Sequence, residues 1–379
     1  MNRDELRRLI LHSLRKQGFR RRNGLILPPS TDDKDHLRSL HSTAVDHKVT
    51  RSAPGLKRHE EALLTSIAVG KGLDPAQIRP ALIEVRPDSQ DELLFRYATL
   101  HWAIPVSSGY GRRIRFLVMD EYHKKLIGVI GLGDPVFNLA VRDSWIGWSK
   151  EAHRTRLGNV MDAFVLGAVP PYSHLLCGKL VAMLAASREV REAFNRKYRS
   201  RRSVIRRKVT DGRVALVTTM SALGRSSIYN RLRYEDRLLF HSLGYSQGSG
   251  EFHFSNGLYG AIFDYADRYC DATAKKSRWG VGFRNRREVI RKTLAKIGLP
   301  PDLLYHGIQR EVFAVPLAQN TREFLRGETS KLKPYKTSVN DLFAWFRTRW
   351  LLPRASRDMR YREFNPDSYR LWSARACNG

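Results

Sequence analysis

Residues 113–133, RIRFLVMDEYHKKLIGVIGLG, predict two neighbouring β-strands. Strongly β-prone residues fill 113–122 and 125–133, and the two polar residues between these runs form a short connection. Ahead of them, DELLFRYATLHWAI (91–104) predicts a helix with apolar residues along one side, followed by a glycine-broken turn. A helix and then a strand pair is therefore expected at the start of the central region.

Three further stretches continue the pattern. NVMDAFVLGAVPPYSHLLCGKLVAMLAAS (159–187) begins as an apolar strand and continues as a helix from Ser173. RVALVTTMSAL (213–223) predicts another buried strand, and GRSSIYNRL (224–232) after it opens a helix. FHSLGYSQGSGEFHF (240–254) predicts a hairpin around a glycine-rich turn.

The order of these elements resembles the GNAT acyltransferase fold, in which a helix N-terminus between two parting strands receives the pyrophosphate of an acyl-CoA. We therefore expect an α+β protein with a GNAT-like mixed central sheet flanked by helices. Three parts are predicted: an N-terminal helical module with a basic hairpin (1–80), the GNAT-like α/β core (88–255) and a mainly helical C-terminal extension (256–379).

The chain is strongly basic. It carries 67 Lys and Arg against 37 Asp and Glu, a net charge of +30 on 379 residues. Such an excess attracts polyanions and favours salt-dependent binding to nucleic acid, although a basic surface can also serve only solubility. An apolar content of 42% excludes wholesale disorder.

The expected compartment is the cytoplasm. The N-terminus has charged residues where a signal peptide needs an apolar core, and charged residues and prolines interrupt the most apolar stretch (160–187), so no membrane association is expected. The three cysteines are far apart in sequence and form no CxxC pair. This pattern predicts neither a zinc site nor a disulfide framework, and it fits a reducing compartment.

The densest basic run is SREVREAFNRKYRSRRSVIRRKVTDGR (187–213), which begins as a helix and ends as a loop. The loop has too little apolar content to pack, so a role in phosphate binding is the preferred interpretation. A mobile solvated loop is the alternative. The cations that carry this prediction are Arg199, Arg201, Arg202, Arg206, Arg207 and Lys208.

The segment GRSSIYNRLR (224–233) places hydroxyls, an amide and guanidiniums at the predicted junction of a strand and a helix. Because helix N-termini attract anions, Arg225, Ser226 and Asn230 are candidates to hold a phosphate of DNA or of a cofactor. Tyr229 stands where GNAT enzymes often have their general acid. The competing interpretation is that a serine here is only an N-cap.

Two more segments are candidates for chemistry. GDPVFNLAVRDSWIGW (133–148) contains Asp134, Asn138 and Asp143, which could act as a base or bind a metal. No fixed metal spacing is present, and Asp134-Pro135 also suits an ordinary turn. In HLLCGKLVAML (174–184), Gly178 and Lys179 are the candidates for cofactor binding at a helix start.

Several long strings in the chain resemble the DruA family, named for the Druantia anti-phage systems of bacteria. They include LFRYATLHWAIPVSSGYGRRIRFLV (94–118), KLIGVIGLGDPVFNLAVRDSWIGW (125–148), VTTMSALGRSSIYNRLR (217–233) and HGIQREVFAVPLA (306–318). The resemblance implies a bacterial or mobile-element protein, encoded in defence operons beside a large helicase or near transposase-like genes. It supplies no catalytic residue and no cofactor.

Three functions are therefore open, and the sequence does not decide whether the chain is an enzyme. In the first, the core binds or processes DNA for defence, with a helicase as partner and with Arg112, Arg113 and the basic run on phosphates. In the second, the chain is an acyl-CoA-dependent N-acyltransferase. In the third, Asp134 and Asp143 meet around a metal in a DNA nuclease or strand-transfer enzyme. The choice between DNA and RNA and the oligomeric state are also open.

Overall fold

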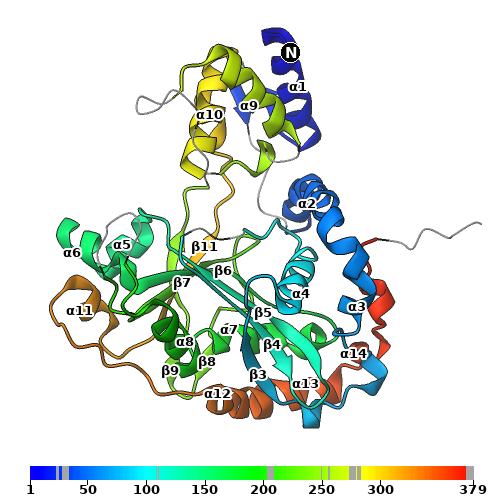
Figure 1. Cartoon of the computed structure of the whole chain (residues 1–379), viewed down its shortest axis with the longest axis vertical. Coiled ribbons are helices and arrows are strands. Elements are labelled where there is room, and N and C mark those ends of the chain that lie inside the picture. Colours follow the sequence, from blue (N-terminus) through cyan, green and yellow to red (C-terminus); the bar gives the residue numbers. More distant parts are fainter. Residues whose placement is uncertain are drawn as a thin grey trace, which may run out of the picture.

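A computed structural model describes most of the chain: residues 1–22, 25–27, 34–107, 109, 111–202, 209–248, 250–254, 257–272, 279 and 283–372. A central sheet runs through the larger part of the molecule, and three helices stand apart from it (Figure 1). Among the described residues, no helix is both long and apolar enough to cross a bilayer.

The central sheet has seven strands in the order β10-β11-β7-β6-β5-β4-β3. The strands β3 to β6 form an antiparallel meander, β7 is parallel to β6, and β11 and β10 continue antiparallel. The mixed sheet flanked by helices confirms the predicted α+β class, while its likeness to GNAT enzymes stays a prediction. The bounds are β3 (Pro80–Glu84), β4 (Arg113–Asp120), β5 (Lys125–Gly133), β6 (Val160–Ala168), β7 (Leu216–Met220), β10 (His241–Tyr245) and β11 (Glu311–Pro316).

The sheet includes two strands outside the predicted core range of 88–255. β3 precedes this range in the sequence and β11 follows it. The predicted hairpin at 240–254 is wrong. Its first arm, β10, pairs with β11, and the described part of its second arm contains the short 3₁₀ turn Phe252–Phe254. Ladder hydrogen bonds to a distant apolar strand replace the local pairing that the glycine-rich turn suggested.

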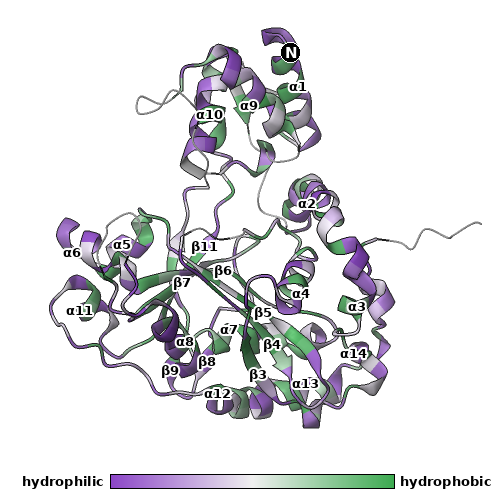
Figure 2. Ribbon diagram, viewed as in Figure 1, coloured by the Kyte–Doolittle hydropathy of each residue, from purple (hydrophilic) through white to green (hydrophobic). Residues whose placement is uncertain are grey.

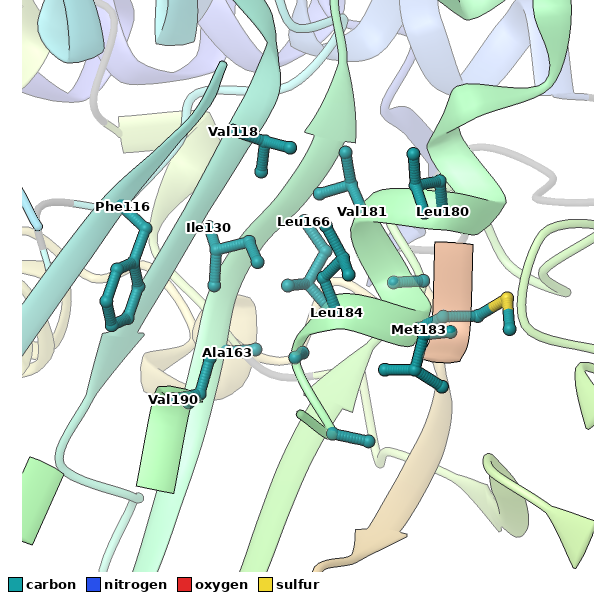
Figure 3. Close-up of a cluster of buried hydrophobic side chains, with 14 of the residues drawn as sticks. Phe116, Val118, Ile130, Ala163, Leu166, Leu180, Val181, Met183, Leu184 and Val190 are labelled. Carbon is teal, nitrogen blue, oxygen red and sulfur yellow. The ribbon is translucent and has the colours of Figure 1, made fainter. Parts of the chain in front are cut away.

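One face of the sheet is covered by α7 (Cys177–Leu184), α8 (Arg188–Tyr198) and α12 (Val339–Phe346). Figure 3 shows the buried side chains where these layers meet: Phe116 and Val118 from β4, Ile130 from β5, Ala163 and Leu166 from β6, and Leu180, Val181, Met183 and Leu184 from α7. Burial of this apolar surface is the main force that holds the helices on the sheet.

The opposite face is covered in two parts. Next to β4 and β5 lie α3 (Glu60–Leu64) and α4 (Gln90–Thr99). Next to β7 and β11 lie α5 (Ala140–Ile146) and α11 (Thr321–Arg326), with α6 (Lys150–Arg156) beside α11. Further helices and short strands are α2 (Lys34–Leu56), α13 (Leu352–Arg357), α14 (Arg360–Glu363), β1 (Arg20–Arg22), β2 (Leu25–Leu27), β8 (Arg233–Tyr234) and β9 (Arg237–Leu238).

The three helices that stand apart come from both halves of the chain. We call α1 (Arg3–Lys16), the pair β1–β2, α9 (Leu258–Tyr269) and α10 (Phe283–Lys296) the helical unit. They share a core of apolar residues that is separate from the sheet, and Figure 2 shows hydrophilic and hydrophobic residues alternating along the helices of the unit. Gln17, after α1, donates a 2.9 Å hydrogen bond to the carbonyl of His253 and so joins the two halves.

His253 makes the stability of this unit depend on pH. Its ring is fully buried, Nε2 donates to the carbonyl of Leu303 (2.7 Å), and burial lowers the pKa of His253 to about 4. An unfolded histidine has a pKa near 6.5. As the pH falls below that value, only the unfolded state takes up the proton, so stability is lost between pH ~6.5 and ~4.

We expect His253→Gln, which keeps a donor for Leu303, to flatten this dependence by roughly 2 kcal/mol between about pH 7 and pH 5. Urea unfolding of both proteins at the two pH values measures the difference. Equal losses of stability in the two proteins would contradict the assignment of this proton to His253.

Candidate nucleic-acid interface

After the C-terminal end of α8, residues 200–202 pair with residues 209 and 210. The Ser200 amide donates to the carbonyl of Thr210 (3.1 Å), the Thr210 amide donates to that of Arg201 (2.9 Å), and Arg202 pairs with Val209 in an antiparallel bridge. We call residues 199–202 and 209–210 the basic arm. Its three arginines are exposed: Arg199, Arg201 and Arg202. The backbone hydrogen bonds give the two ends of the predicted loop a defined structure.

The predicted phosphate ligands Arg206, Arg207 and Lys208 lie outside the described residues. The three arginines of the basic arm form no ion pair with any described residue, whereas the cations just before them do. Arg196 and Lys197 both lie near Glu84, with N–O distances of 3.2 and 3.1 Å. The positive charge of α8 is thus partly neutralised within the protein, and that of the arm faces solvent.

Tyr198 fixes the arm to the sheet. Its hydroxyl accepts from the amide of Arg113 (2.7 Å) and donates to the carbonyl of the same residue (2.7 Å). Burial raises the pKa of Tyr198, which keeps the phenol protonated as this pair of bonds requires. Arg113, the first residue of β4, is exposed and lies beside the arm.

Arg112, which we expected on a phosphate, binds within the protein. Its Nε donates to Asp134 (2.7 Å), its Nη1 donates to the carbonyl of Gly158 (2.8 Å), and its guanidinium lies 5.2 Å from the ring centre of Phe194. Asp134 also accepts from the Arg112 amide (3.0 Å). This contact joins the loop before β4 to the loop after β5, close to the basic arm.

The loop after β5 is organised by a buried arginine. Arg142 has no exposed surface, and its guanidinium donates to Asp143 and to the carbonyls of Val136 (2.8 Å) and Phe137 (2.9 Å). Asp143 in turn accepts from the amide of Leu139 (2.9 Å). A buried charge is tolerated only with such partners, so this network is structural.

Asp134 and Asp143 therefore each bind an arginine. Asn138, the third candidate in this segment, is exposed on the same loop. Among the described residues, no group of three or more His, Cys, Asp and Glu side chains is placed to hold a metal ion. We do not propose the nuclease or strand-transfer reaction, which needed these carboxylates to meet around a metal.

A carboxylate that the sequence did not single out lies on the adjacent strand. Asp162 on β6 is aligned with Gly133 on β5, and it accepts a 2.8 Å hydrogen bond from the hydroxyl of Thr218 on β7. Burial raises the pKa of Asp162 to about 6, although the Thr218 bond and the charge of Arg142 lower it in part. A charged residue inside an otherwise apolar strand was the available signal.

The expected helix at 224–232 is wrong, because the segment forms successive turns. The Ser226 hydroxyl accepts from the amides of Ile228 (3.2 Å) and Tyr229 (3.1 Å), and the Ser226 amide donates to the buried carboxylate of Glu311 (3.1 Å). A left-handed backbone at Gly224 and at Arg231 (φ 60° and 59°) interrupts helical geometry on either side. Arg225 is exposed and Asn230 is half-buried.

Tyr229, the candidate general acid, is buried in the core. Its ring stacks on Phe240 at a centroid distance of 4.9 Å and meets the edge of Phe313 at 5.3 Å. Burial raises the pKa of Tyr229 to about 12. These contacts are those of a packing residue.

The candidate cofactor residues at the start of α7 face the same turns. Lys179 Nζ donates to the carbonyl of Ile228 (3.4 Å) and lies 5.8 Å from the ring centre of Trp350, and burial lowers the pKa of Lys179. A methyl group added at Gly178 would lie 3.5 Å from the Ile228 side chain. Protein groups cover this helix start, so we do not propose an acyl-CoA there.

The helical unit is a second concentration of positive charge. The sequence that contains this unit has 18 Lys and Arg against seven Asp and Glu, counted over residues 1–27 and 257–304. The basic residues on β1 belong to the basic hairpin that was predicted within the N-terminal module, and residues 23 and 24 between β1 and β2 lie outside the described residues. Exposed cations of the unit are Arg3, Arg8, Arg15, Lys16, Arg20, Arg22, Arg268, Arg291 and Lys296.

Comparisons with known proteins agree with the resemblance seen in the sequence. The family profile "Druantia protein DruA" matches residues 31–327. A curated protein described as Druantia protein DruA, from Escherichia coli (strain UMEA 4076-1), is 39% identical over 374 residues, which cover 98% of this chain and 90% of that protein. No solved structure matches significantly.

Proposed function

From the premise that this chain belongs to the DruA family, we propose that it binds the phosphodiester backbone of DNA in bacterial anti-phage defence. The basic arm and Arg113 form the first contact surface in this proposal, and the helical unit forms the second. A helicase encoded beside it is the proposed partner. The family resemblance implies an operon that also encodes a large helicase, and a helicase acts on nucleic acid. This context supports the choice of DNA.

The observation that carries the proposal is the basic arm with its three exposed arginines, none of which has an acidic partner among the described residues. A guanidinium group that pairs with no carboxylate of the protein is available to bind a phosphate. Arg suits phosphate oxygens because its N–H donors form a planar fork. Tyr198 holds the arm at the start of β4. The arm therefore offers charge in a defined place.

The net charge of +30 supports the same function over a longer range. A field of this size steers a polyanion toward the surface and is screened by salt. The helical unit would add a second contact with the same backbone, since most of its exposed cations lie on α1, β1 and α10.

Binding of a short labelled DNA duplex, followed by fluorescence anisotropy over a salt series, tests the proposal. Each neutralised phosphate releases a counterion, so we expect the affinity to fall by roughly 1,000-fold or more between about 50 mM and 200 mM salt. Failure to bind either this duplex or its single strand at about 50 mM salt would refute the proposal. Binding that does not change with salt would refute the phosphate contacts.

A further inference from the structure

The loop between β5 and α5 exposes an aromatic ring. Phe137 has 57% of its surface in solvent. Phe137 lies in the loop that follows Gly133, the last residue of β5. Gly133 pairs with Arg113, the first residue of β4. The loop is therefore at the same end of the β4–β5 pair as the basic arm.

The backbone of Phe137 is held by side chains on two helices. Its carbonyl accepts from the buried guanidinium of Arg142 (2.9 Å), at the start of α5, and from Nε2 of His153 on α6 (2.8 Å). The His153 ring also meets the Phe137 ring edge to face, at a centroid distance of 4.8 Å. An exposed ring is commonplace by itself, but here a buried charge fixes its position, so little ordering is needed when it makes a contact.

Cations and aromatic rings surround the loop. Trp148 meets the His153 ring edge to face at a centroid distance of 4.7 Å. Arg322 lies 5.5 Å from the ring centre of Trp145, and Arg154 is exposed on α6. The carboxylates of Asp134, on this loop, and of Asp143, on α5, each bind an arginine. The surroundings of Phe137 therefore suit an anionic partner with flat apolar groups.

We propose that Phe137 stacks on an unpaired base of DNA while the basic arm holds the backbone of the same strand. Sites for single-stranded nucleic acid combine a cationic track for phosphates with aromatic rings for bases, and both parts are present at this end of the sheet. The inference rests on the proposed function, and it adds a preference for single-stranded or locally opened DNA.

The test compares the full-length protein with Phe137→Ala and Phe137→Trp in binding a single-stranded oligonucleotide and the duplex of the same sequence. Loss of one stacked base weakens binding by roughly 10-fold. We expect this loss for Phe137→Ala on the single strand, a change of less than about 2-fold on the duplex, and wild-type affinity for Phe137→Trp.

Tyr122→Ala is the matched control. Tyr122 is 52% exposed in the turn after β4, and eight residues of strand, about 26 Å, separate it from the Arg113 end. We expect this variant to bind both DNAs as the wild type does. Because Phe137 and Tyr122 are both exposed, all three variants should keep the wild-type unfolding midpoint.

Two outcomes separate the proposals. If the wild type binds DNA but Phe137→Ala binds the single strand equally well, stacking is refuted and DNA binding stands; a protein that docks on Phe137 would give this result. If the wild type binds neither DNA, the proposed function itself fails.

Discussion

Replacing Arg142 with Met should lower the free energy of unfolding by about 3–5 kcal/mol, the usual cost of breaking a buried ion pair by removing one partner. The Met side chain fills a similar volume but leaves the carboxylate of Asp143 and the carbonyls of Val136 and Phe137 without their donor. Denaturant unfolding, read as the shift in midpoint at constant slope, measures the loss.

Two variants show whether the cause is the buried charge. Arg291→Met removes an exposed guanidinium from its ion pair with Glu288 (2.7 Å) and should cost less than about 1 kcal/mol. In the Arg142→Met background, Asp143→Asn removes the unpaired carboxylate and should restore part of the lost stability. A cost below about 1 kcal/mol for Arg142→Met would show that the network does not hold the loop.

Reversing the charge of the basic arm should have the largest effect on DNA binding. In the triple variant, three arginines become glutamate: Arg199, Arg201 and Arg202. Each phosphate contact contributes a factor of about eight to affinity at about 0.1 M salt, so losing three contacts weakens duplex binding by roughly 500-fold. Electrostatic repulsion from the new carboxylates adds to the loss.

The matched control has the same change in net charge at the far end of the sheet. Its three cations are exposed and become glutamate: Lys71, Arg79 and Lys124. Arg79 directly precedes β3, whose first residue pairs with the last residue of β4, and Lys124 lies in the turn after β4. We expect a loss of less than about 10-fold from this variant, because only long-range attraction is reduced.

The sequence predicted the elements whose signal is local. The β4–β5 pair follows from two β-prone runs around a short polar connection. The helix expected at the start of the basic run 187–213 is confirmed as α8, whereas the phosphate-binding role of the arginines after it stays a prediction.

Long-range pairings could not be predicted in this way. β10 pairs with β11, whose residues come 66 to 73 positions later, and α1 packs on helices more than 240 residues away. Nothing near Arg142 marks it as buried, since a charged residue in a polar segment is normally exposed. At 224–232 the backbone is left-handed at Gly224 and Arg231 and does not continue as the expected helix, and the amide of Ser226 donates to Glu311 from a distant strand.

The salt dependence of duplex binding, compared between the wild type and the basic-arm triple variant, tests the central claim most directly. If the three arginines contact phosphates, the slope of log affinity against log salt is smaller by about 3 in the triple variant, while the far-end control keeps the wild-type slope. Equal slopes for the wild type and the triple variant would show that DNA does not lie on the basic arm.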